Sequence, residues 1–378
     1  MSVKSLTMRR VLVVGGGIIG TMHAYLALKA GYEVVQVERD SVPSSASVRN
    51  FGLVWVSGRE AGNELQLAIR ARELWGQIGS QASIGFRSNG SLTVAQSDSE
   101  FSVMQEAASM DDASLRGFEI LNKREVQDLE PVLAGNFVGA LRCTSDAAVE
   151  PLLLLSGLRS EMQKSEHYKW LPNFDVDSFT HSDTGNHITD VNGKMISGDL
   201  LVLCPGAAHA GFLSEHFTQA PVRKVFLQMG STVPIIEQLG HSVADADSMR
   251  YYPAFKNLSL DRLPPQSKVA AENHMQLLLA PRFDGSFTIG DTHLYQEPFS
   301  HEIIEEPYEH LTSVISNIFG RELKIGKRWS GIYSQSTSSD IYFRREVAPG
   351  AFIVTGAGGR GNTLSPAIAE ETITSWAI

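Results

Sequence analysis

Residues 11–20, VLVVGGGIIG, decide how the N-terminal part of this chain folds. The first four residues are a continuous branched apolar run, which is typical of a strand buried on both faces of a parallel sheet. Gly15, Gly17 and Gly20 follow at G-x-G-x-x-G spacing, and the next stretch, TMHAYLALKAG, has the composition of a helix. Strand, glycine loop and helix in this order predict a unit that binds the pyrophosphate of a dinucleotide.

Each glycine of this loop has a mechanical role. We expect Gly15 to turn the chain, Gly17 to let the backbone approach a pyrophosphate, and Gly20 to let the helix pack against the strand. The helix then begins at Ile18 and Ile19, whose backbone N–H groups are expected to face the phosphates.

A second apolar run, EVVQVE, ends at Glu38, eighteen residues beyond Gly20. A carboxylate at the tip of that strand is placed to hydrogen-bond ribose hydroxyls. An acidic residue there disfavours a 2'-phosphate, and hence NADP, because the two would repel each other. The unit by itself leaves NAD and FAD open, since both use it.

Composition limits the other possibilities. A chain of 378 residues is long enough for two domains, and its net charge of -10 argues against nucleic acid or an anionic membrane as a partner. No stretch approaches the roughly 20 apolar residues that span a bilayer. The two cysteines, Cys143 and Cys204, form no disulfide framework, and the histidines show no H-x3-H or H-E-x-x-H pair, so we predict no metal site.

The N-terminal segment, residues 1–17, begins as a secretory signal does, with basic residues before an apolar run. The run is short, is broken by three glycines and lacks a small-residue cleavage site. We therefore expect no signal peptide and a cytoplasmic protein, which agrees with the low cysteine content.

A second glycine-rich stretch, GAGGRGNTLS, occupies residues 356–365 between the apolar run AFIVT and a predicted closing helix, PAIAEETITSWAI. A nucleotide-binding unit for NAD needs one glycine loop, whereas a flavin buried along its whole length needs a second close approach of backbone. We expect three glycines to allow that approach and two polar residues to supply hydrogen bonds near the helix start: Gly358, Gly359, Gly361, Asn362 and Thr363.

Ala24, four residues after Gly20, and Gly31, seven further on, extend the first fingerprint in the manner of FAD-binding oxidoreductases. With these residues the sequence resembles the FAD-dependent amino acid and amine oxidase family, the group of D-amino acid oxidase, glycine oxidase and sarcosine oxidase. The resemblance extends over nearly the full chain. It implies a non-covalent FAD, because relatives that bond the flavin through cysteine do so in the C-terminal half, and both cysteines here precede residue 205.

The resemblance and the strand pattern together imply an α/β protein of two interleaved domains. The first is a Rossmann-like FAD-binding domain of residues 1–88, 145–218 and 325–378. The second is an α+β substrate domain of residues 89–144 and 219–324, built on a mainly antiparallel sheet, for which alternating runs such as VRKVFLQMGS and SFTIGDTHLY are the evidence.

Further cofactor contacts are implied by the resemblance. The polar segment after Glu38 would run along the pyrophosphate and ribityl chain, Val176 would pack on the adenine, and Gly206 would end the strand beneath the cofactor. The complete set of expected cofactor-binding residues is Gly15, Gly17, Ile18, Ile19, Gly20, Glu38, Arg39, Ser45, Ser47, Asn50, Val176, Gly206, Gly331, Gly358, Gly359, Gly361, Asn362 and Thr363.

In the family that the chain resembles, the flavin takes a hydride from the carbon beside an amine, and water hydrolyses the resulting imine to an aldehyde or other carbonyl compound and an amine or ammonia. Two positions depart from the relatives. Tyr333 stands where glycine oxidase and D-amino acid oxidase have an arginine for the substrate carboxylate, and Thr288 stands where sarcosine oxidases have a lysine for oxygen activation. Other cations must therefore meet an acidic substrate group, and oxygen is less favoured as electron acceptor than in those relatives.

The stretches SVRNFG, YYPAF, GDTHLY and GGRGNTLS resemble the subfamily linked to aminophosphonate catabolism. This implies a small anionic amine as substrate, 2-aminoethylphosphonate or an N-methylated or hydroxylated relative, whose phosphonate suits arginine. The catalytic candidates are Tyr252, His293, Tyr333 and Arg360, and the substrate-binding candidates are Arg49, Asn50, Arg250 and Tyr295.

Three alternatives remain at this point. The same chemistry could act on glycine, sarcosine or iminodiacetate. The chain could also be a non-catalytic flavoprotein or one component of a larger complex, or an NAD-binding dehydrogenase, which the second glycine loop disfavours. The electron acceptor, oxygen or another such as a quinone, and the oligomeric state stay open.

Overall fold

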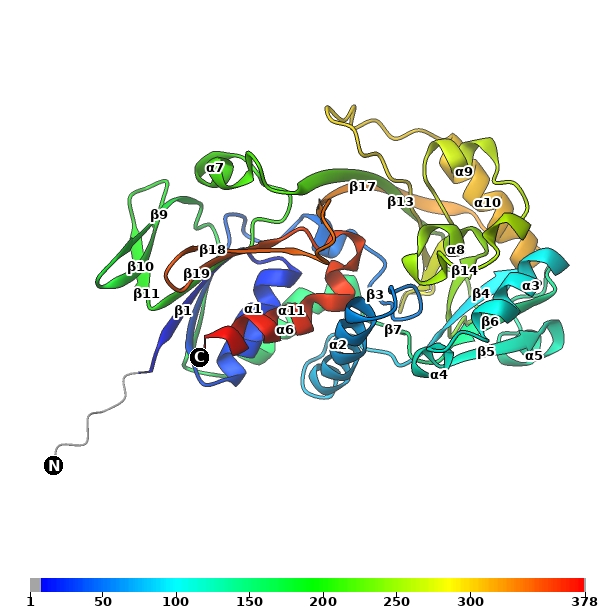
Figure 1. Cartoon of the computed structure of the whole chain (residues 1–378), viewed down its shortest axis with the longest axis horizontal. Coiled ribbons are helices and arrows are strands. Elements are labelled where there is room, and N and C mark those ends of the chain that lie inside the picture. The colour runs from blue at the N-terminus through cyan, green and yellow to red at the C-terminus, as the bar shows by residue number, and fades with distance from the viewer. Residues whose placement is uncertain (1–7, 377–378) are drawn as a thin grey trace.

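The computed structural model of the chain describes residues 8–376. Two short ranges lie outside the described residues. Residues 1–7 are the start of the segment that begins as a secretory signal does, and residues 377–378 are the end of the predicted closing helix. Figure 1 shows two sheet-based units side by side, with the chain passing between them several times.

The first unit is built on a six-stranded sheet in the order β18-β19-β12-β1-β2-β8. Its strands are β1 (Arg10–Val14), β2 (Glu33–Val37), β8 (Tyr168–Leu171), β12 (Leu200–Leu203), β18 (Phe343–Ala348) and β19 (Ala351–Thr355). β1 lies in the middle and pairs in parallel with β2 and β12. Because both of its faces are covered, Val11, Leu12 and Val13 are fully buried, which confirms the buried strand predicted from the apolar run.

Four helices pack together beside this sheet (Figure 1): α1 (Ile18–Lys29), α2 (Asn63–Gly79), α6 (Pro151–Met162) and α11 (Gly361–Ser375). Leu67, Ala71 and Trp75, which stand at helical spacing in the sequence, are buried on one face of α2. The Trp75 indole N–H lies 3.0 Å from the Thr363 carbonyl oxygen and so joins α2 to the first turn of α11. The C-terminal helix thus begins beside elements from the first third of the chain.

The second unit is built on an eight-stranded sheet in the order β17-β13-β16-β15-β14-β4-β6-β5. Its strands are β4 (Ser91–Ala95), β5 (Phe118–Asn122), β6 (Gly139–Cys143), β13 (Val222–Thr232), β14 (Ser242–Asp245), β15 (Leu278–Pro281), β16 (Phe287–Gly290) and β17 (Ile325–Ser336). Each neighbouring pair is antiparallel except β14 with β4. The prediction of a mainly antiparallel second sheet is therefore confirmed.

The remaining elements connect or cover these sheets. The helices are α3 (Asp98–Ala107), α4 (Ala113–Arg116), α5 (Lys123–Leu129), α7 (Ser214–Phe217), α8 (Asp247–Tyr251), α9 (Lys268–Glu272) and α10 (Glu306–Phe319). A three-stranded sheet consists of β9 (Val176–Ser182), β10 (Gly185–Asp190) and β11 (Met195–Gly198), and a two-stranded one of β3 (Leu53–Val54) and β7 (Ala147–Ala148). α10 ends at Gly320 in the left-handed conformation, which glycine adopts readily at the end of a helix.

The expected return of the chain to the first unit at residue 325 comes later. β17 pairs with β13 from Ile325 to Ser336, so this stretch forms an edge of the second sheet, and the chain joins the first sheet only at β18. The residue pattern of RWSGIYS, residues 328–334, is typical of a strand. The same pattern would appear in a strand of either sheet, so the sequence could not show which sheet this strand joins.

The strand predicted across SFTIGDTHLY is also shorter than expected. β16 ends at Gly290; beyond it Leu294 still pairs with Phe226 of β13, and the backbone N–H of His293 donates to the Asn273 carbonyl oxygen at 2.9 Å. Asp291, His293 and Tyr295 stand two residues apart, so their side chains share one face, and all three line a cavity.

Asp245, at the end of β14, is a buried acid outside that cavity. Burial, with Asp247 and Glu100 nearby, raises its pKa to about 8. Between pH 4 and 8 the folded chain therefore holds a proton that the unfolded chain has lost, so the free energy of unfolding falls as pH rises, by about 1.4 kcal/mol per pH unit from this group. Asp245→Asn should flatten that decline, measured by urea unfolding at several pH values. Equal slopes in the variant and the wild type would contradict the raised pKa.

Candidate active site

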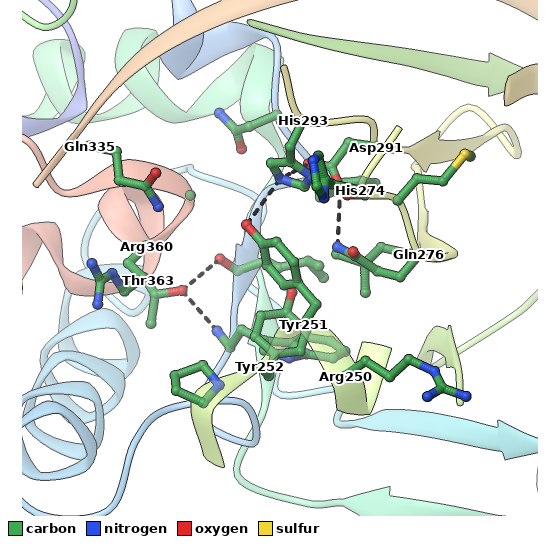
Figure 2. A pocket seen from close by; sticks show the side chains of 18 of the residues that line it. Arg250, Tyr251, Tyr252, His274, Gln276, Asp291, His293, Gln335, Arg360 and Thr363 are labelled. Carbon is green, nitrogen blue, oxygen red and sulfur yellow. Dashed lines mark hydrogen bonds and ion pairs between the residues drawn. The ribbon is translucent and has the colours of Figure 1, made fainter. Parts of the chain in front are cut away.

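A cavity of about 470 Å³ lies between the start of α11 and the second sheet. Its wall draws on distant parts of the chain, including the segment from Asn50 to Trp55, α8, the residues after β16 and the glycine-rich stretch before α11. Figure 2 shows Arg360, Thr363 and Gln335 on one side and His293, Asp291 and Gln276 on the other, with Tyr251 and Tyr252 between them. The cavity is therefore built by both units together.

The first glycine loop has the geometry expected of a dinucleotide-binding turn. Gly15 has a φ of +115°, and a Cβ there would lie 2.5 Å from the Cys204 carbonyl oxygen. A Cβ on Gly20 would collide with the carbonyl oxygen of Gly15, because α1 crosses close to the end of β1. Gly17 is the N-cap of α1 and has no side chain to cover the first helical turn.

Glu38 follows β2 directly and faces this loop. Its carboxylate accepts hydrogen bonds from the backbone N–H of Gly16 at 2.6 Å and of Asp40 at 3.1 Å. The Phe174 N–H donates to the Glu38 carbonyl oxygen at 2.9 Å, which brings the segment that leads to Val176 against the strand tip. Arg39 is exposed beside this tip. Positions expected to meet the ribose and the adenine are thus adjacent.

The polar segment after Glu38 is braced from within. Ser47 Oγ accepts from the N–H of Ile18 at 2.9 Å, and the Ser45 carbonyl oxygen accepts from the Val48 N–H at 3.2 Å in a short 3-10 turn. The Asn50 amide donates to the Ala46 and Ser47 carbonyl oxygens, at 3.0 and 2.8 Å, and accepts from the Gly52 N–H. The segment is therefore an ordered part of the first unit. It lies over the start of α1.

Arg49 lies outside the cavity wall. Its Nε donates to the Ser44 carbonyl oxygen at 2.8 Å, and its Nη1 donates to the Ser330 carbonyl oxygen at 2.9 Å, beside Gly331. This geometry ties the polar segment to β17 and does not support the expected substrate contact. Sequence could not show this, because both acceptors are backbone atoms, and that of Ser330 belongs to a distant strand.

The second glycine-rich stretch is tighter than a loop. Gly358 has a φ of +61° and opens a 3-10 turn, and α11 begins at once with Gly361. Thr363 Oγ1 accepts from the Trp55 N–H at 3.0 Å, and the Asn362 amide donates to the Leu53 carbonyl oxygen at 2.9 Å. The Asn362 Oδ1 is buried and has no hydrogen-bond partner among residues 8–376, so a polar acceptor is available where the helix meets the cavity. Gly206, which follows β12, has a φ of +58°, and its carbonyl oxygen accepts from the Thr355 hydroxyl at the end of β19.

A cationic cluster of Arg59, Arg360 and Glu64 forms one end of the cavity. Oε1 of Glu64 lies 3.5 Å from Nη1 of Arg59 and 3.3 Å from Nη1 of Arg360. Two guanidinium groups share one carboxylate, so the cluster keeps a net positive charge. Arg360 was expected here, but Arg59 and Glu64 were missed, since GREAGNE reads as an ordinary solvated connection before α2.

Arg59 is held in place by its neighbours. Its side chain is buried, its Nε donates to the Trp55 carbonyl oxygen at 2.8 Å, and its guanidinium lies 5.7 Å from the centre of the Tyr252 ring. The fully buried Arg116 supports the same segment, because its Nη1 donates to the carbonyl oxygens of Ser57 and Arg59 at 2.9 and 2.8 Å.

The opposite end of the cavity is acidic and aromatic. Asp291 Oδ2 lies 3.5 Å from Nε2 of His293, and that nitrogen lies 3.0 Å from the hydroxyl of Tyr251. Gln276 donates from Nε2 to Asp291 Oδ1 at 3.3 Å. Burial raises the pKa of the Asp291 carboxyl, and the nearby His293 opposes that rise. His293 was an expected catalytic residue, whereas Asp291, Gln276 and Tyr251 were not singled out.

The tyrosines among the predicted residues take different places. Tyr252 lines the cavity and packs on Trp55 with ring centres 6.1 Å apart, and Tyr295 lines it under the guanidinium of Arg223. The Tyr333 hydroxyl is buried next to Gly359 and finds no hydrogen-bond partner in the part of the chain that the structure describes. Burial and the neighbouring Tyr251 hold its pKa well above the ordinary value.

Arg250 also lines the cavity, but its guanidinium is committed elsewhere. Nε donates to Asp247 Oδ1 at 3.0 Å, and the two terminal nitrogens donate to the carbonyl oxygens of Leu260 and Pro264. Figure 2 shows the side chain directed away from Arg360 and His293. The expected contact of Arg250 with substrate therefore lacks geometric support.

Thr288 stands at the position of the lysine in sarcosine oxidases, and its side chain is hydrogen-bonded to Arg282, the residue after β15. Arg282 Nε donates to Thr288 Oγ1 at 2.7 Å, and its Nη2 donates to the Asn50 carbonyl oxygen at 3.0 Å. Burial lowers the pKa of this guanidinium to about 10. Arg282 remains a cation at neutral pH and lies against the cavity residue Asn50.

Two further features concern metals and membranes. Within residues 8–376, no three or more histidine, cysteine, aspartate or glutamate side chains gather as metal ligands would. Helices long and apolar enough for a bilayer are likewise missing from that range.

Comparisons with known proteins agree with this fold. Residues 10–374 match the family described as FAD dependent oxidoreductase. A sequence relative is one of the subunits of opine oxidase from Rhizobium meliloti, 27% identical over 164 residues, which are 40% of this chain and 44% of that protein. The matched region covers about half of the length of such curated relatives, 44% and 55% in two of them.

Among solved structures, glycine oxidase from Geobacillus kaustophilus is similar with a TM-score of 0.76 at 18% identity, over 96% of this chain and 93% of that one. Iminodiacetate oxidase from Chelativorans sp. BNC1 is similar with a TM-score of 0.75 at 19% identity, over 97% and 95%. At this identity the two structures support the fold. The family match spans both units and both glycine-rich stretches, and it shows that the chain belongs to the FAD dependent oxidoreductase family.

Proposed function

We propose that this flavoenzyme oxidises the C–N bond of a small amine that also carries an anionic group. The observation that carries the proposal is the polarity of the cavity. Arg59 and Arg360 share Glu64 at one end, and the buried Asp291 lies at the other. A small molecule with an ammonium group and an anion complements both ends.

The residues present fit FAD. The glycine loop, the first turn of α1 and Glu38 suit its pyrophosphate and ribose, although the Ile18 N–H, expected to face a phosphate, donates to Ser47 Oγ. Asn362 Oδ1, which has no hydrogen-bond partner among residues 8–376, suits a donor on the ring system. Bound FAD supplies the two-electron acceptor for the C–H bond beside nitrogen. The chain's own residues have to hold the anion, orient the carbon and manage the proton of the amine.

The substrate that we put first is 2-aminoethylphosphonate or an N-methylated or hydroxylated relative. Two guanidinium groups suit a dianionic phosphonate, because each can offer paired N–H donors to its oxygens. Tyr333 in place of the relatives' carboxylate-binding arginine points the same way, since it leaves β17 without a cation at that position.

The second candidate is the same reaction on glycine, sarcosine or iminodiacetate. It is favoured by the similarity to glycine oxidase and iminodiacetate oxidase, which cover nearly the whole fold. A third candidate is a role as one component of a larger complex, which the opine oxidase relative favours because it is named as one of that enzyme's subunits. Anaerobic reduction of the bound flavin by an amine, in the isolated chain, distinguishes catalysis by this chain from a purely structural flavin.

A substrate panel tests the proposal directly. The purified holoprotein is assayed with 2-aminoethylphosphonate, its N-methyl and hydroxylated forms, glycine, sarcosine, iminodiacetate, and ethylamine as an amine without an anion. We expect turnover of the anionic amines, fastest for the phosphonates, and little turnover of ethylamine. Faster turnover of glycine than of every phosphonate would select the second candidate, and preference for ethylamine would contradict the proposal.

Arg360→Ala should raise KM for the anionic amines about 10- to 100-fold, because a charged hydrogen bond contributes about 1.5 to 3 kcal/mol. Bound flavin, measured by absorbance, should stay at the wild-type ratio. Arg70→Ala is the control, since Arg70 is an exposed guanidinium paired with Glu370 on the outer face of α2 and should leave KM unchanged. A wild-type KM in Arg360→Ala would place its guanidinium outside the substrate site.

A further inference from the structure

The acidic end of the cavity contains a carboxylate with few donors. Asp291 is 8% exposed, and a single side-chain hydrogen bond, the 3.3 Å contact from Gln276, reaches it among residues 8–376. A buried carboxylate ordinarily accepts several hydrogen bonds or pairs with a cation. His293 is the basic group within ion-pair distance, at 3.5 Å.

The hydrogen bonds of His293 determine which of its nitrogens is free. Nδ1 lies 2.9 Å from the carbonyl oxygen of His274, and since a carbonyl oxygen only accepts, Nδ1 carries the hydrogen. Nε2 is then the nitrogen that gains or loses a proton. It faces both the Tyr251 hydroxyl, at 3.0 Å, and Asp291 Oδ2. Asp291 Oδ2 and His293 Nε2 can therefore act in sequence, the first as proton acceptor and the second as the group to which the proton is transferred.

The three tyrosine hydroxyls around this pair are neutral at physiological pH, and the imidazole of His274 lines the same cavity. Tyr251 comes from α8, Tyr333 from β17 and Tyr295 from the segment after β16, and burial raises the pKa of all three hydroxyls. His274 and Gln276, from the segment before β15, complete the surroundings through a backbone carbonyl and an amide. The arginines that line the same cavity are already paired, Arg59 and Arg360 with Glu64 and Arg250 with Asp247.

If the anionic group of the substrate binds at Arg59 and Arg360, its amine lies against the rest of the cavity wall. An amine is an ammonium ion at neutral pH, and in that form its nitrogen has no lone pair to form a C=N bond. Oxidation therefore needs a group that first binds the ammonium and then removes a proton from it. Asp291 is the cavity carboxylate that lies away from the arginine pairs.

We propose that Asp291 binds the ammonium group of the substrate and takes up one of its protons, with His293 Nε2 as the next proton carrier. The proposal rests on the proposed function, because it needs an amine as substrate. One N–H bond breaks, its electron pair stays on nitrogen as the lone pair, and an O–H bond forms on the Asp291 carboxylate. The proton then moves from Oδ2 to Nε2 of His293, whose positive charge the carboxylate balances.

Asp291→Asn tests this directly in the holoenzyme. The amide has nearly the shape of the carboxylate but cannot accept the proton, so kcat/KM at pH 7 should fall by about 10²- to 10⁴-fold. The variant should recover with rising pH, because the free amine becomes available in solution, and the gap to wild type should narrow about tenfold per pH unit below the pKa of the amine. Asp245→Asn is the matched control, a buried aspartate outside the cavity wall, and should keep wild-type kcat/KM.

Inhibition separates this role from a general loss of structure. The probes are the N,N,N-trimethyl form of the panel member that is turned over fastest and its amine-free analogue, ethylphosphonate for 2-aminoethylphosphonate or acetate for glycine. In Asp291→Asn, the inhibition constant of the trimethylammonium probe should rise at least tenfold, and that of the amine-free anion should stay within about twofold. Equal weakening of both probes would contradict an ammonium contact.

His293→Gln provides a second variant in case Asp291→Asn does not fold. In the wild type, kcat/KM should rise with pH as Asp291 ionises. Glutamine cannot take up a proton from Asp291, so in His293→Gln kcat should fall at least tenfold, while the inhibition constant of the trimethylammonium probe should stay within about twofold because Asp291 is still present. A wild-type kcat in His293→Gln would remove His293 as the proton carrier, and a kcat/KM of Asp291→Asn that equals the wild-type value overturns the role of Asp291. A wild-type protein that oxidises no amine of the panel contradicts the proposed function itself, and with it the amine that Asp291 would serve.

Discussion

Gly20→Ala is expected to yield a protein that no longer retains FAD. The methyl group would collide with the carbonyl oxygen of Gly15, and that atom belongs to the backbone, so it cannot turn aside as a side chain would. Either α1 must move away from β1 or the turn at Gly15 must change, and both distort the site for the pyrophosphate. We expect the purified variant to contain less than about a tenth of the wild-type flavin and to lose about 1 to 3 kcal/mol of unfolding free energy.

The measurement is the ratio of flavin absorbance to protein absorbance after gel filtration, with urea unfolding of wild type and variant beside it. Gly76→Ala is the control, because a Cβ at that position of α2 first meets the flexible end of Arg72, at 3.5 Å. Alanine in a helix interior should keep the flavin and raise stability by about 0.5 to 1 kcal/mol. A yellow Gly20→Ala protein with wild-type stability would show that the helix is not packed on the turn as described.

Arg116→Met is expected to cause the largest loss of stability of the substitutions considered. The guanidinium is fully buried, donates to three carbonyl oxygens and pairs with Asp112 at 2.6 Å; the acceptors are Val56, Ser57 and Arg59. Methionine fills much of the space but leaves those acceptors and the carboxylate without their donor. Breaking a buried pair in this way costs about 3 to 5 kcal/mol of unfolding free energy.

Arg124→Met is a close control for this change. Arg124 also stands four residues from an aspartate in a helix, Asp128, but 90% of its side chain is exposed. Its replacement should alter the unfolding free energy by less than about 0.5 kcal/mol. If Arg116→Met folds, it should also raise KM for the anionic amines, since the segment that carries Arg59 loses its support. Equal effects of the two substitutions on urea unfolding would contradict the structural role of Arg116.

The cofactor site was the part of the molecule most open to prediction. Gly15 and Gly20 are needed for steric reasons, so a short stretch reveals its own geometry, and both positions behave as their spacing predicts. The same holds for α2 and α10, whose apolar residues repeat at helical spacing. These features depend on contacts between residues that are close in sequence, or on positions where only glycine fits.

The substrate end was much less open to prediction. Arg49 and Arg250 were reasonable choices by residue type, yet their guanidinium groups are used on backbone carbonyls, whereas Arg59 comes from a stretch that reads as a solvated connection. Whether an arginine meets water, a carbonyl or a cavity depends on which distant segments fold against it. Residue type alone carries no record of that.

The sequence by itself determined the family, the dinucleotide-binding unit, the alternation of two sheets and a tight glycine-rich turn at residues 356–365, because glycine spacing and apolar periodicity are local properties of the chain. Only the tertiary structure decided that β17 joins the second sheet, that Glu64 binds Arg59 and Arg360 together, and that Asp291 and His293 face the same cavity as the start of α11. Each of these depends on hydrogen bonds and ion pairs whose partners come together only when the chain has folded, and their strength comes from burial that no single segment can supply.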